Sequence, residues 1–186
     1  MSLTLDQFKQ IMPRMARNQA LATLLLPALN AAMAEREINS PTRMAAFLAQ
    51  IAHESGEFRF MSEEWGPTAV QKRYDPPFKL SKVLGNDKPG DGFKYRGAGP
   101  LQLTGKDNFR TYGKALGLDL VNKPDLARDP KVGLRIAALF WERKGLNTLA
   151  DSGDFTGITH RINGGENGLE QREAYWKVAK KALGVL

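Results

Sequence analysis

The sequence contains no cysteine and only two histidines among its 186 residues. The lack of thiols excludes disulfide bonds and a thiolate nucleophile, and it leaves few ligands for a typical catalytic zinc site. His53-Glu54 begins like the helix motif of zinc peptidases, but Glu57 stands where that motif requires a second histidine. A zinc amidase or peptidase is therefore disfavoured, and we expect neither a metal nor another cofactor.

A long apolar span is also missing. Residues 18–34 carry no charge and superficially resemble a signal peptide, but Gln19, Pro27 and Asn30 make them too polar and too short to cross a bilayer. An amphipathic segment with Asp6 precedes them, where a signal peptide would have a short basic region. We expect a cytoplasmic product without a clear signal peptide and without stable membrane insertion.

Acidic residues are fewer than basic ones: the sequence has 20 Asp and Glu and 27 Lys and Arg, which gives a net charge of +7. Such a molecule is attracted to polyanions, among which nucleic acid, anionic lipid and the anionic bacterial wall qualify. The basic residues are scattered in pairs such as Lys72-Arg73 and Lys180-Lys181, without a long run or an RNA-binding signature. We expect no nucleic-acid partner, and a solubilising surface explains the charge about as well as a polyanion site does.

Helical patterns dominate what is present, and no internal repeat or linker interrupts them. The chain is long enough for one well-buried core, and its 42% hydrophobic and 25% charged residues are ordinary for a globular protein. Thr4 and Gln7 form a capping-box pattern, and the helix that follows residue 13 should kink or break at Pro27. We predict a mainly α fold with at most a small β-hairpin, and a single domain over residues 1–186.

The stretch that organises the chain is a predicted helix from Pro41 to about His53. Ser40 is its expected N-cap, Pro41 suits its first position, and Gly56 offers a left-handed C-cap. Its apolar face follows the i, i+3, i+4, i+7 spacing; the residues on this face are Met44, Phe47, Leu48 and Ile51. Glu54 continues that face at the rim of the core, an apolar setting that favours the protonated carboxyl of a general acid.

Two further carboxylates, Glu63 and Glu64, follow the break at Gly56. Carboxylates near one another can serve acid/base hydrolysis, so these residues are candidates to act with Glu54. Residue types alone are weak evidence, because most pairs of glutamates are solvated surface charges.

Residues 66–93 are rich in Pro, Gly, Lys and Asp and almost lack periodicity, so we expect a long loop that walls a binding cleft. Residues 93–105 contain several glycines that match neither a P-loop nor a dinucleotide fingerprint. Residues 101–104 then alternate apolar and polar side chains, which predicts a short strand-like piece with Gln102 and Thr104 on one face.

Three separated motifs occur together: Phe47-Leu-Ala-Gln-Ile-Ala-His-Glu-Ser-Gly56, Tyr95-Arg-Gly-Ala-Gly-Pro-Leu-Gln-Leu-Thr-Gly105 and Ile158-Thr-His-Arg-Ile-Asn-Gly-Gly165. In this order they resemble glycoside hydrolase family 19, in the compact version of bacterial chitinase-like proteins and phage endolysins. The resemblance covers nearly the whole chain. It implies a lysozyme-like bilobed helical domain with a substrate cleft, which cleaves β-1,4 bonds next to N-acetylated sugars with inversion.

The resemblance also implies roles for individual residues. Glu54 matches the general acid and Glu63 best matches the general base, with a shift by one residue to Glu64 left open. Thr104 matches the hydroxyl that helps to hold the attacking water. Positions that contact substrate or belong to the polar network are matched by Tyr95, Gln102, Asn108, Asn163 and Arg172.

One position departs from the family, which commonly has Arg where this chain has Ala98. Apart from the joint pattern, Gln102 and Thr104 read as a polar pair in a turn, Asn163 as a C-cap, and His53 as a structural histidine. The departure at Ala98 concerns one polar contact near the cleft and leaves the acid/base pair unaffected.

The leading hypothesis is a peptidoglycan-degrading endolysin of the muramidase (lysozyme) type, encoded by a bacteriophage, a prophage or a bacterium. A chitinase that acts on N-acetylglucosamine polymers is the alternative within the enzyme class, and a cationic wall-binding module is the non-enzyme alternative. We expect a monomer that is made in the bacterial cytoplasm and acts in the periplasm or cell wall after holin-type release. Its expected partners are the glycan strands of peptidoglycan.

Overall fold

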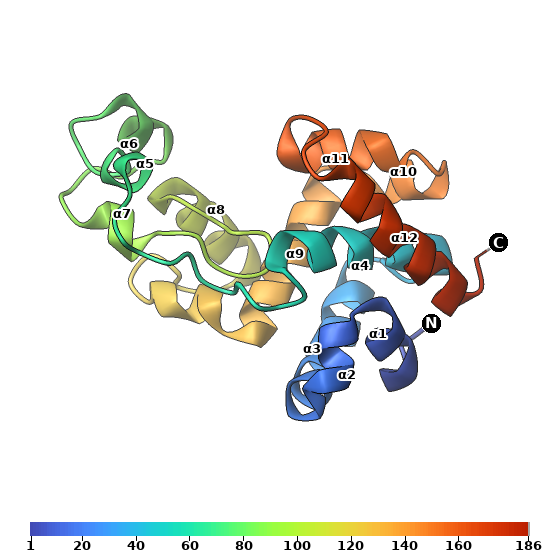
Figure 1. Ribbon diagram of the computed structural model, residues 1–186. Coiled ribbons are helices and arrows are strands. Elements are labelled where there is room, and N and C mark those ends of the chain that lie inside the picture. Colours follow the sequence, from blue (N-terminus) through green and yellow to red (C-terminus); the bar gives the residue numbers. More distant parts are fainter. Residues whose placement is uncertain (186) are drawn as a thin grey trace. The chain divides into compact units, whose positions relative to one another are not determined.

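The structure is a computed structural model in which residues 1–185 are described, and it is mainly helical (Figure 1). Within these residues no β-strand forms, and pairing is limited to isolated bridges that join Ser62 to Ala98 and Ala98 to Leu103. The prediction of a mainly α fold with at most a small hairpin is confirmed.

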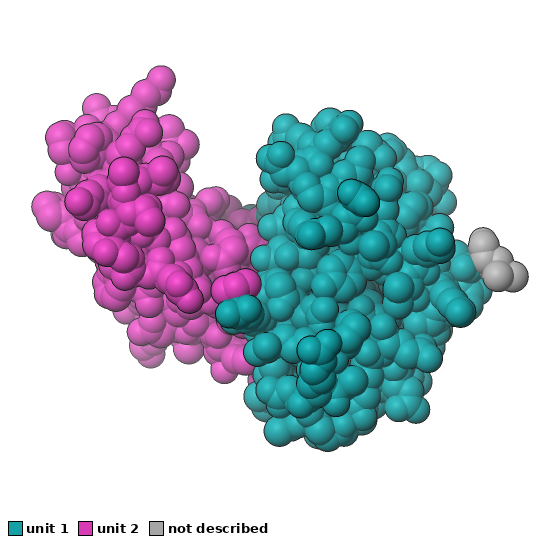
Figure 2. Space-filling view, viewed as in Figure 1, with its two compact units in different colours: residues 1–59, 137–186 teal, residues 60–136 magenta. Residues whose placement is uncertain are grey.

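The chain divides into two compact units, and Figure 2 colours them separately. Unit 1 consists of residues 1–59 and 137–186, and unit 2 of residues 60–136. The single-domain boundary of residues 1–186 stays a prediction.

Unit 1 holds most of the longer helices. These are α1 (Leu5–Ile11), α2 (Pro13–Arg17), α3 (Gln19–Glu35), α4 (Pro41–Ser55), α10 (Leu146–Asp151), α11 (Phe155–Asn163) and α12 (Leu169–Leu183). Unit 2 holds α5 (Ala69–Lys72), α6 (Lys79–Val83), α7 (Asp91–Lys94), α8 (Lys106–Leu116) and the 3₁₀ helix η1 (Pro124–Arg128). Helix α9 (Pro130–Arg143) begins in unit 2 and ends in unit 1.

Helix α4 is the centre of unit 1; it begins at the predicted Pro41 and ends at Ser55, two residues beyond the predicted His53. The Ser40 side chain accepts a hydrogen bond from the Arg43 N–H, Pro41 occupies the first turn, and Gly56 closes the helix at φ 55°. Phe47 is fully buried and meets Trp141 edge-to-face, with 5.3 Å between ring centroids. Helix α12 packs along α4 (Figure 1), so that α4 is covered over most of its length.

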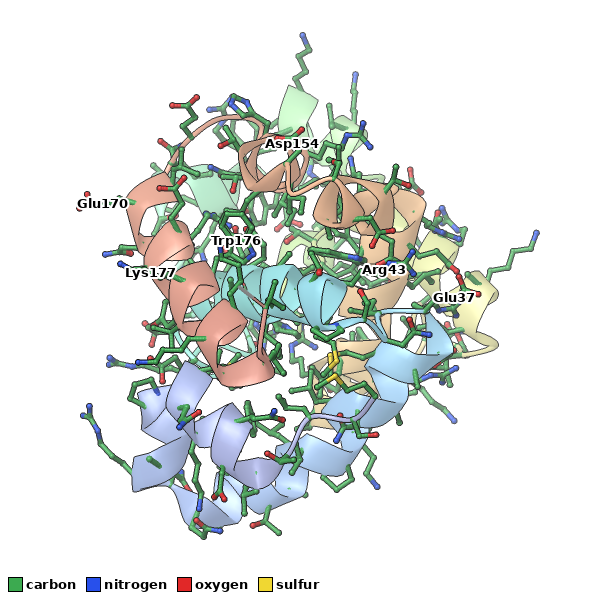
Figure 3. The ribbon with its side chains drawn as sticks, turned by 90° about the vertical axis from the view of Figure 1, so that its right-hand side faces the viewer. Glu37, Arg43, Asp154, Glu170, Trp176 and Lys177 are labelled. Carbon is green, nitrogen blue, oxygen red and sulfur yellow. The ribbon has the colours of Figure 1, made fainter. Side chains whose placement is uncertain are left out.

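The outer helices of unit 1 are joined to this core by aromatic contacts. Trp176 of α12 stacks on Phe155 of α11 at a centroid separation of 4.4 Å. Trp176 points from α12 toward the neighbouring helices, whereas Glu170 and Lys177 of the same helix point outward (Figure 3). Asp154 caps α11 by accepting from the Gly157 N–H.

The expected kink or break at Pro27 is wrong in one respect, because α3 is unbroken from Gln19 to Glu35. Asn18 caps its start by accepting from the Leu21 N–H. Leu25 and Leu29, on either side of Pro27, are buried, so packing on both sides of the proline offsets the hydrogen bond that the ring removes.

The expectation of a loop without secondary structure over residues 66–93 is also wrong, since α5, α6 and α7 lie within it. Buried polar groups order this segment in place of an apolar stripe. Asn86 is 3% exposed; it donates to the Tyr74 carbonyl and accepts from the Lys106 N–H. Asp91 is 6% exposed and accepts from the N–H groups of residues 87 and 88. A search for hydrophobic periodicity does not detect order of this kind.

Within residues 1–185 no helix has the length and apolar composition that crossing a membrane would require.

Replacing Phe47 by Ala should lower the free energy of unfolding by about 3–5 kcal/mol, because it leaves a cavity beside Trp141 in the core of unit 1. Denaturant unfolding monitored by circular dichroism measures this loss. Leu24→Ala is the matched control, because Leu24 is 57% exposed and its truncation should change stability by no more than about 0.5 kcal/mol. Equal losses in the two variants would contradict the placement of Phe47.

Candidate active site

Glu54 lies in the last turn of α4, two residues before Gly56, the left-handed C-cap of the helix. Its side chain is 25% exposed, and its Oε1 accepts from Nη2 of Arg172 at 2.5 Å. Arg172 belongs to α12, which packs along α4, and is only 2% exposed. The apolar setting expected for Glu54 is therefore wrong, because a buried guanidinium stands beside the carboxylate.

The guanidinium of Arg172 is fixed by partners on three sides. Nη1 donates to the Gln50 side chain, Nη2 to Glu54, and Nε to the Asn167 carbonyl at 3.2 Å. Gln50 in turn donates to the Thr159 hydroxyl at 2.9 Å, and both of these side chains are fully buried. A buried polar network that is satisfied in this way holds its members in a single geometry.

Asn163 joins the same network at the end of α11. Its Nδ2 donates to the Asn167 carbonyl at 3.3 Å, so that Asn163 and Arg172 bond to the same oxygen. Asn163 also precedes Gly164, the left-handed C-cap of α11 at φ 76°. Two of the predicted site residues, Arg172 and Asn163, are thus brought together with Glu54 in unit 1.

His53 is half-buried next to this network but does not join it through a hydrogen bond in the described residues. Burial lowers the pKa of His53, and the nearby Arg172 lowers it further. A side chain at Gly168 would collide with the imidazole ring, so the ring packs closely against the loop before α12. This placement agrees with the structural interpretation of His53.

Glu63 in unit 2 has a carboxylate with directed partners on both oxygens. Oε2 accepts from the Gly97 N–H at 2.9 Å, and Oε1 accepts from Gln71 Nε2 at 2.8 Å and lies 3.5 Å from the Tyr74 hydroxyl. Burial raises the pKa of Tyr74, and the neighbouring Glu63 raises it further, so the phenol keeps its proton at neutral pH. The Glu64 side chain, by contrast, is exposed.

Gln71 performs two tasks with one side chain. Its Oε1 accepts from the Thr68 N–H at 2.7 Å in the capping box that starts α5. Its Nε2 donates both to the Glu63 carboxylate at 2.8 Å and to the Glu64 carbonyl at 2.6 Å. Because Gln71 is 5% exposed, the start of α5 and the orientation of Glu63 depend on the same buried amide.

Gln102, Thr104 and Asn108 form a chain of hydrogen bonds in unit 2. Gln102 has φ 51° and donates to the carbonyls of Phe60 and Gly99 at 3.1 and 3.0 Å. The Thr104 hydroxyl donates to the Gln102 carbonyl at 2.9 Å, and Asn108 donates to the Thr104 carbonyl at 2.7 Å. Residues 99–102 are thus a turn in which the left-handed Gln102 reverses the chain, and the predicted strand-like piece is reduced to the bridge of Leu103 to Ala98.

Tyr95 requires a correction, because it was expected to contact substrate. The residue is 1% exposed, its hydroxyl donates to the Val121 carbonyl at 3.0 Å, and its ring packs edge-to-face on Phe109. Tyr95 therefore belongs to the core of unit 2. Ala98, the position that departs from the family, is also buried at 1% and exchanges backbone hydrogen bonds with Leu103.

Sequence reasoning missed the residues that support the two carboxylates. Gln50 precedes Glu54 by four residues, so the helical period already places both on one face of α4. Gln71 follows Thr68 in the spacing of a capping box, which is a readable local signal. Thr159 and the carbonyl of Asn167 had no such signal, because their partners lie far away in the sequence or use the backbone.

A family model and the sequences of known proteins both place this chain in the same family. The family model for class I chitinases, glycoside hydrolase family 19, matches residues 21–152. A Haemophilus influenzae protein described as containing a glycosyl hydrolase family 19 domain is 36% identical over 153 residues, which cover 70% of this chain and 74% of that protein. An Arabidopsis thaliana endochitinase is 35% identical over 165 residues, 85% of this chain, and the match spans about half (52%) of its own length.

Solved structures show the same fold. A bacterial family 19 chitinase superposes with a TM-score of 0.75 at 23% identity, covering 98% of this chain and 95% of its own. Chitinase C from Streptomyces griseus gives 0.73 at 20% identity, with coverage of 97% and 92%. The helical fold is thus that of family 19 enzymes. The chain belongs to glycoside hydrolase family 19, and the protein is a glycoside hydrolase.

Proposed function

We propose that this glycoside hydrolase is an endolysin of the muramidase type, which hydrolyses β-1,4 bonds between the N-acetylated sugars of peptidoglycan. The observation that carries the proposal is the pair of separately anchored carboxylates in a family 19 chain: Glu54 on Arg172, and Glu63 on Gly97 and Gln71. The net charge of +7 favours the anionic wall over chitin, which is neutral.

Glu54 acts as the general acid in this proposal. Its carboxyl protonates the glycosidic oxygen, and Arg172 stabilises the carboxylate that remains once the proton has left. Gln50 and Asn167 hold Arg172, so the guanidinium needs no reorientation during the step.

Glu63 acts as the general base that removes a proton from the attacking water. Its partners are a backbone N–H, an amide and a phenol, none of which is a cation, so its negative charge stays available for the proton of the water. Inversion requires the two carboxyl groups to stand about 6.5–9.5 Å apart, with the water between sugar and base. Thr104 and its neighbour Asn108 would hold that water or the sugar next to it.

An aromatic group beside Glu63 suits a sugar substrate. Trp65 is half-buried and lies 6.1 Å from Tyr74 and 5.6 Å from Phe93, measured between ring centroids. Phe93 is 49% exposed, and the Arg96 guanidinium lies 4.1 Å from its ring centroid. Aromatic faces of this kind bury the apolar C–H groups of a pyranose ring, while neighbouring polar groups bind its hydroxyls.

The chitinase alternative rests on the relatives, since the Arabidopsis thaliana proteins that this chain matches are described as endochitinases. The two candidates share the acid/base chemistry and differ in the polymer that they cut. Synthesis in the bacterial cytoplasm and release to the wall by a holin-type pore complete the endolysin proposal, together with a phage or prophage origin and a monomeric state.

Purified peptidoglycan should be cut to soluble fragments whose reducing ends, identified by mass spectrometry, belong to one of its two amino sugars. Glu54→Gln should reduce this rate by about 10²–10⁴-fold, because glutamine keeps the volume of the side chain but cannot deliver a proton. An unchanged circular dichroism spectrum of the variant would separate lost chemistry from lost fold. If N-acetylglucosamine oligomers are cleaved and peptidoglycan is not, the result would support the chitinase alternative instead.

Glu63→Gln should lower kcat by about 10²–10⁴-fold, whereas Glu64→Gln should stay within about threefold of the parent, because of these two neighbours it is Glu63 whose carboxylate is anchored. Steady-state kinetics on the same substrate compares the two variants, which differ by one position and remove the same charge. A severe loss confined to Glu64→Gln would move the base by one residue.

Gln71→Ala should lower kcat roughly tenfold with little change in KM, because the Glu63 carboxylate loses a donor that orients it. Gln7→Ala is the matched control: Gln7 is the corresponding glutamine of the capping box of α1, and its side chain bonds to Thr4 and to the Ala182 carbonyl. Equal kinetic effects of the two variants would reduce Gln71 to a helix cap.

A further inference from the structure

A hollow of about 440 Å³ lies on unit 1 next to the end of α4. Its lining consists of Arg14, Arg17, Asn18, Gly56, Glu57 and Arg59. Gly56 and Glu57 follow Glu54 by two and three residues, so the hollow adjoins the chain segment that carries the proposed general acid. It is polar, open and lined by more cations than anions.

The wall of this hollow is formed by an unusual backbone. Gly56, Glu57 and Phe58 have φ values of 55°, 56° and 64°, so three successive residues adopt the left-handed conformation, two of them without the freedom of glycine. Such strain persists only where surrounding contacts enforce it, and it is concentrated at functional sites.

The contacts that enforce this conformation come from Glu57 and Ser55. The Glu57 carboxylate accepts from the Tyr175 hydroxyl at 2.8 Å and from the Arg14 backbone N–H at 2.6 Å. The Ser55 hydroxyl accepts from the Phe58 N–H at 2.8 Å. Burial, together with the bond to Glu57, raises the pKa of Tyr175 to about 12, so the phenol stays a donor at neutral pH.

The charged groups of the hollow differ in whether they have partners. Both oxygens of Glu57 are occupied by neutral donors, and three arginines against one glutamate leave a net charge of +2. Over residues 1–185, the guanidinium groups of Arg14 and Arg17 form no ion pair with a carboxylate, and both residues are exposed. Guanidinium groups bind carboxylates and phosphates through paired N–H donors.

We propose that this hollow binds carboxylate groups of the peptide stems on the peptidoglycan strand, and that Arg14 and Arg17 are the binding residues. The inference rests on the proposed function, because only a glycan with acidic substituents offers such groups beside the bond to be cut. Wall phosphate polymers present a similar anion, but they are separate molecules. Stem carboxylates, by contrast, are linked to the strand that Glu54 acts on.

The test uses the full chain and the double variant Arg14→Gln/Arg17→Gln, which keeps the Arg14 backbone N–H that bonds to Glu57. The matched control is Lys79→Gln/Lys82→Gln on α6, where two exposed charges are removed in unit 2. Binding of an uncleaved disaccharide–peptide fragment is followed by amide NMR shifts at Asn18, Gly56 and Glu57. A second fragment with amidated carboxylates and inorganic phosphate are the comparison ligands.

The arginine variant should bind the fragment with free carboxylates at least about tenfold more weakly than the parent does, whereas the lysine variant should bind it almost as tightly as the parent. The amidated fragment should bind weakly to all three proteins. Hydrolysis of neutral N-acetylglucosamine oligomers should be the same in both variants and the parent.

The site would be overturned if both fragments bound with equal affinity, or if the arginine and lysine variants lost equal affinity for the free fragment. Tighter binding of inorganic phosphate than of the fragment would also overturn it. The binding assay needs no cleavage, so its outcome is separate from that of the proposed function. Fragment binding without peptidoglycan hydrolysis would refute the endolysin and keep the site. Peptidoglycan hydrolysis and fragment binding that are both unaffected in the arginine variant would refute the site and keep the endolysin.

Discussion

The guanidinium of Arg172 is the interaction on which unit 1 depends. A positive charge that is 2% exposed is tolerated only when every donor has a partner, because an uncompensated buried charge is strongly destabilising. The partners come from α4 through Gln50 and Glu54, and from the loop before α12 through Asn167. The same charge therefore holds the helices together and aims the carboxylate that we propose as the acid.

The second carboxylate is held by a different kind of environment. Glu63 has neutral donors on both oxygens, whereas Glu54 has a cation on one. Each carboxylate is thus oriented by partners within its own unit, Glu54 by a buried cation and Glu63 by a backbone N–H and a buried amide.

Local features such as helix ends could be predicted from the sequence, whereas hydrogen bonds between residues far apart in the chain could not. The bounds of α4 follow from Ser40, Pro41 and Gly56, whose effects act within one turn, and Glu54 follows from the helical period. The Gln50–Thr159 and Gln50–Arg172 bonds join residues 109 and 122 positions apart, and pairs of this kind leave no periodic trace. Tyr95 was misjudged for the same reason, since its burial depends on Val121 and Phe109 and not on the glycines around it.

Gln71 has a consequence for heat inactivation. Helix α5 has only four residues, too few to be stable in isolation, and its capping amide also holds Glu63. Local opening of so short an element requires far less free energy than global unfolding. When α5 frays, the carboxylate that we propose as the base loses one of its donors, although the Gly97 N–H still holds its other oxygen. We therefore expect activity to decline at temperatures where both cores are still folded.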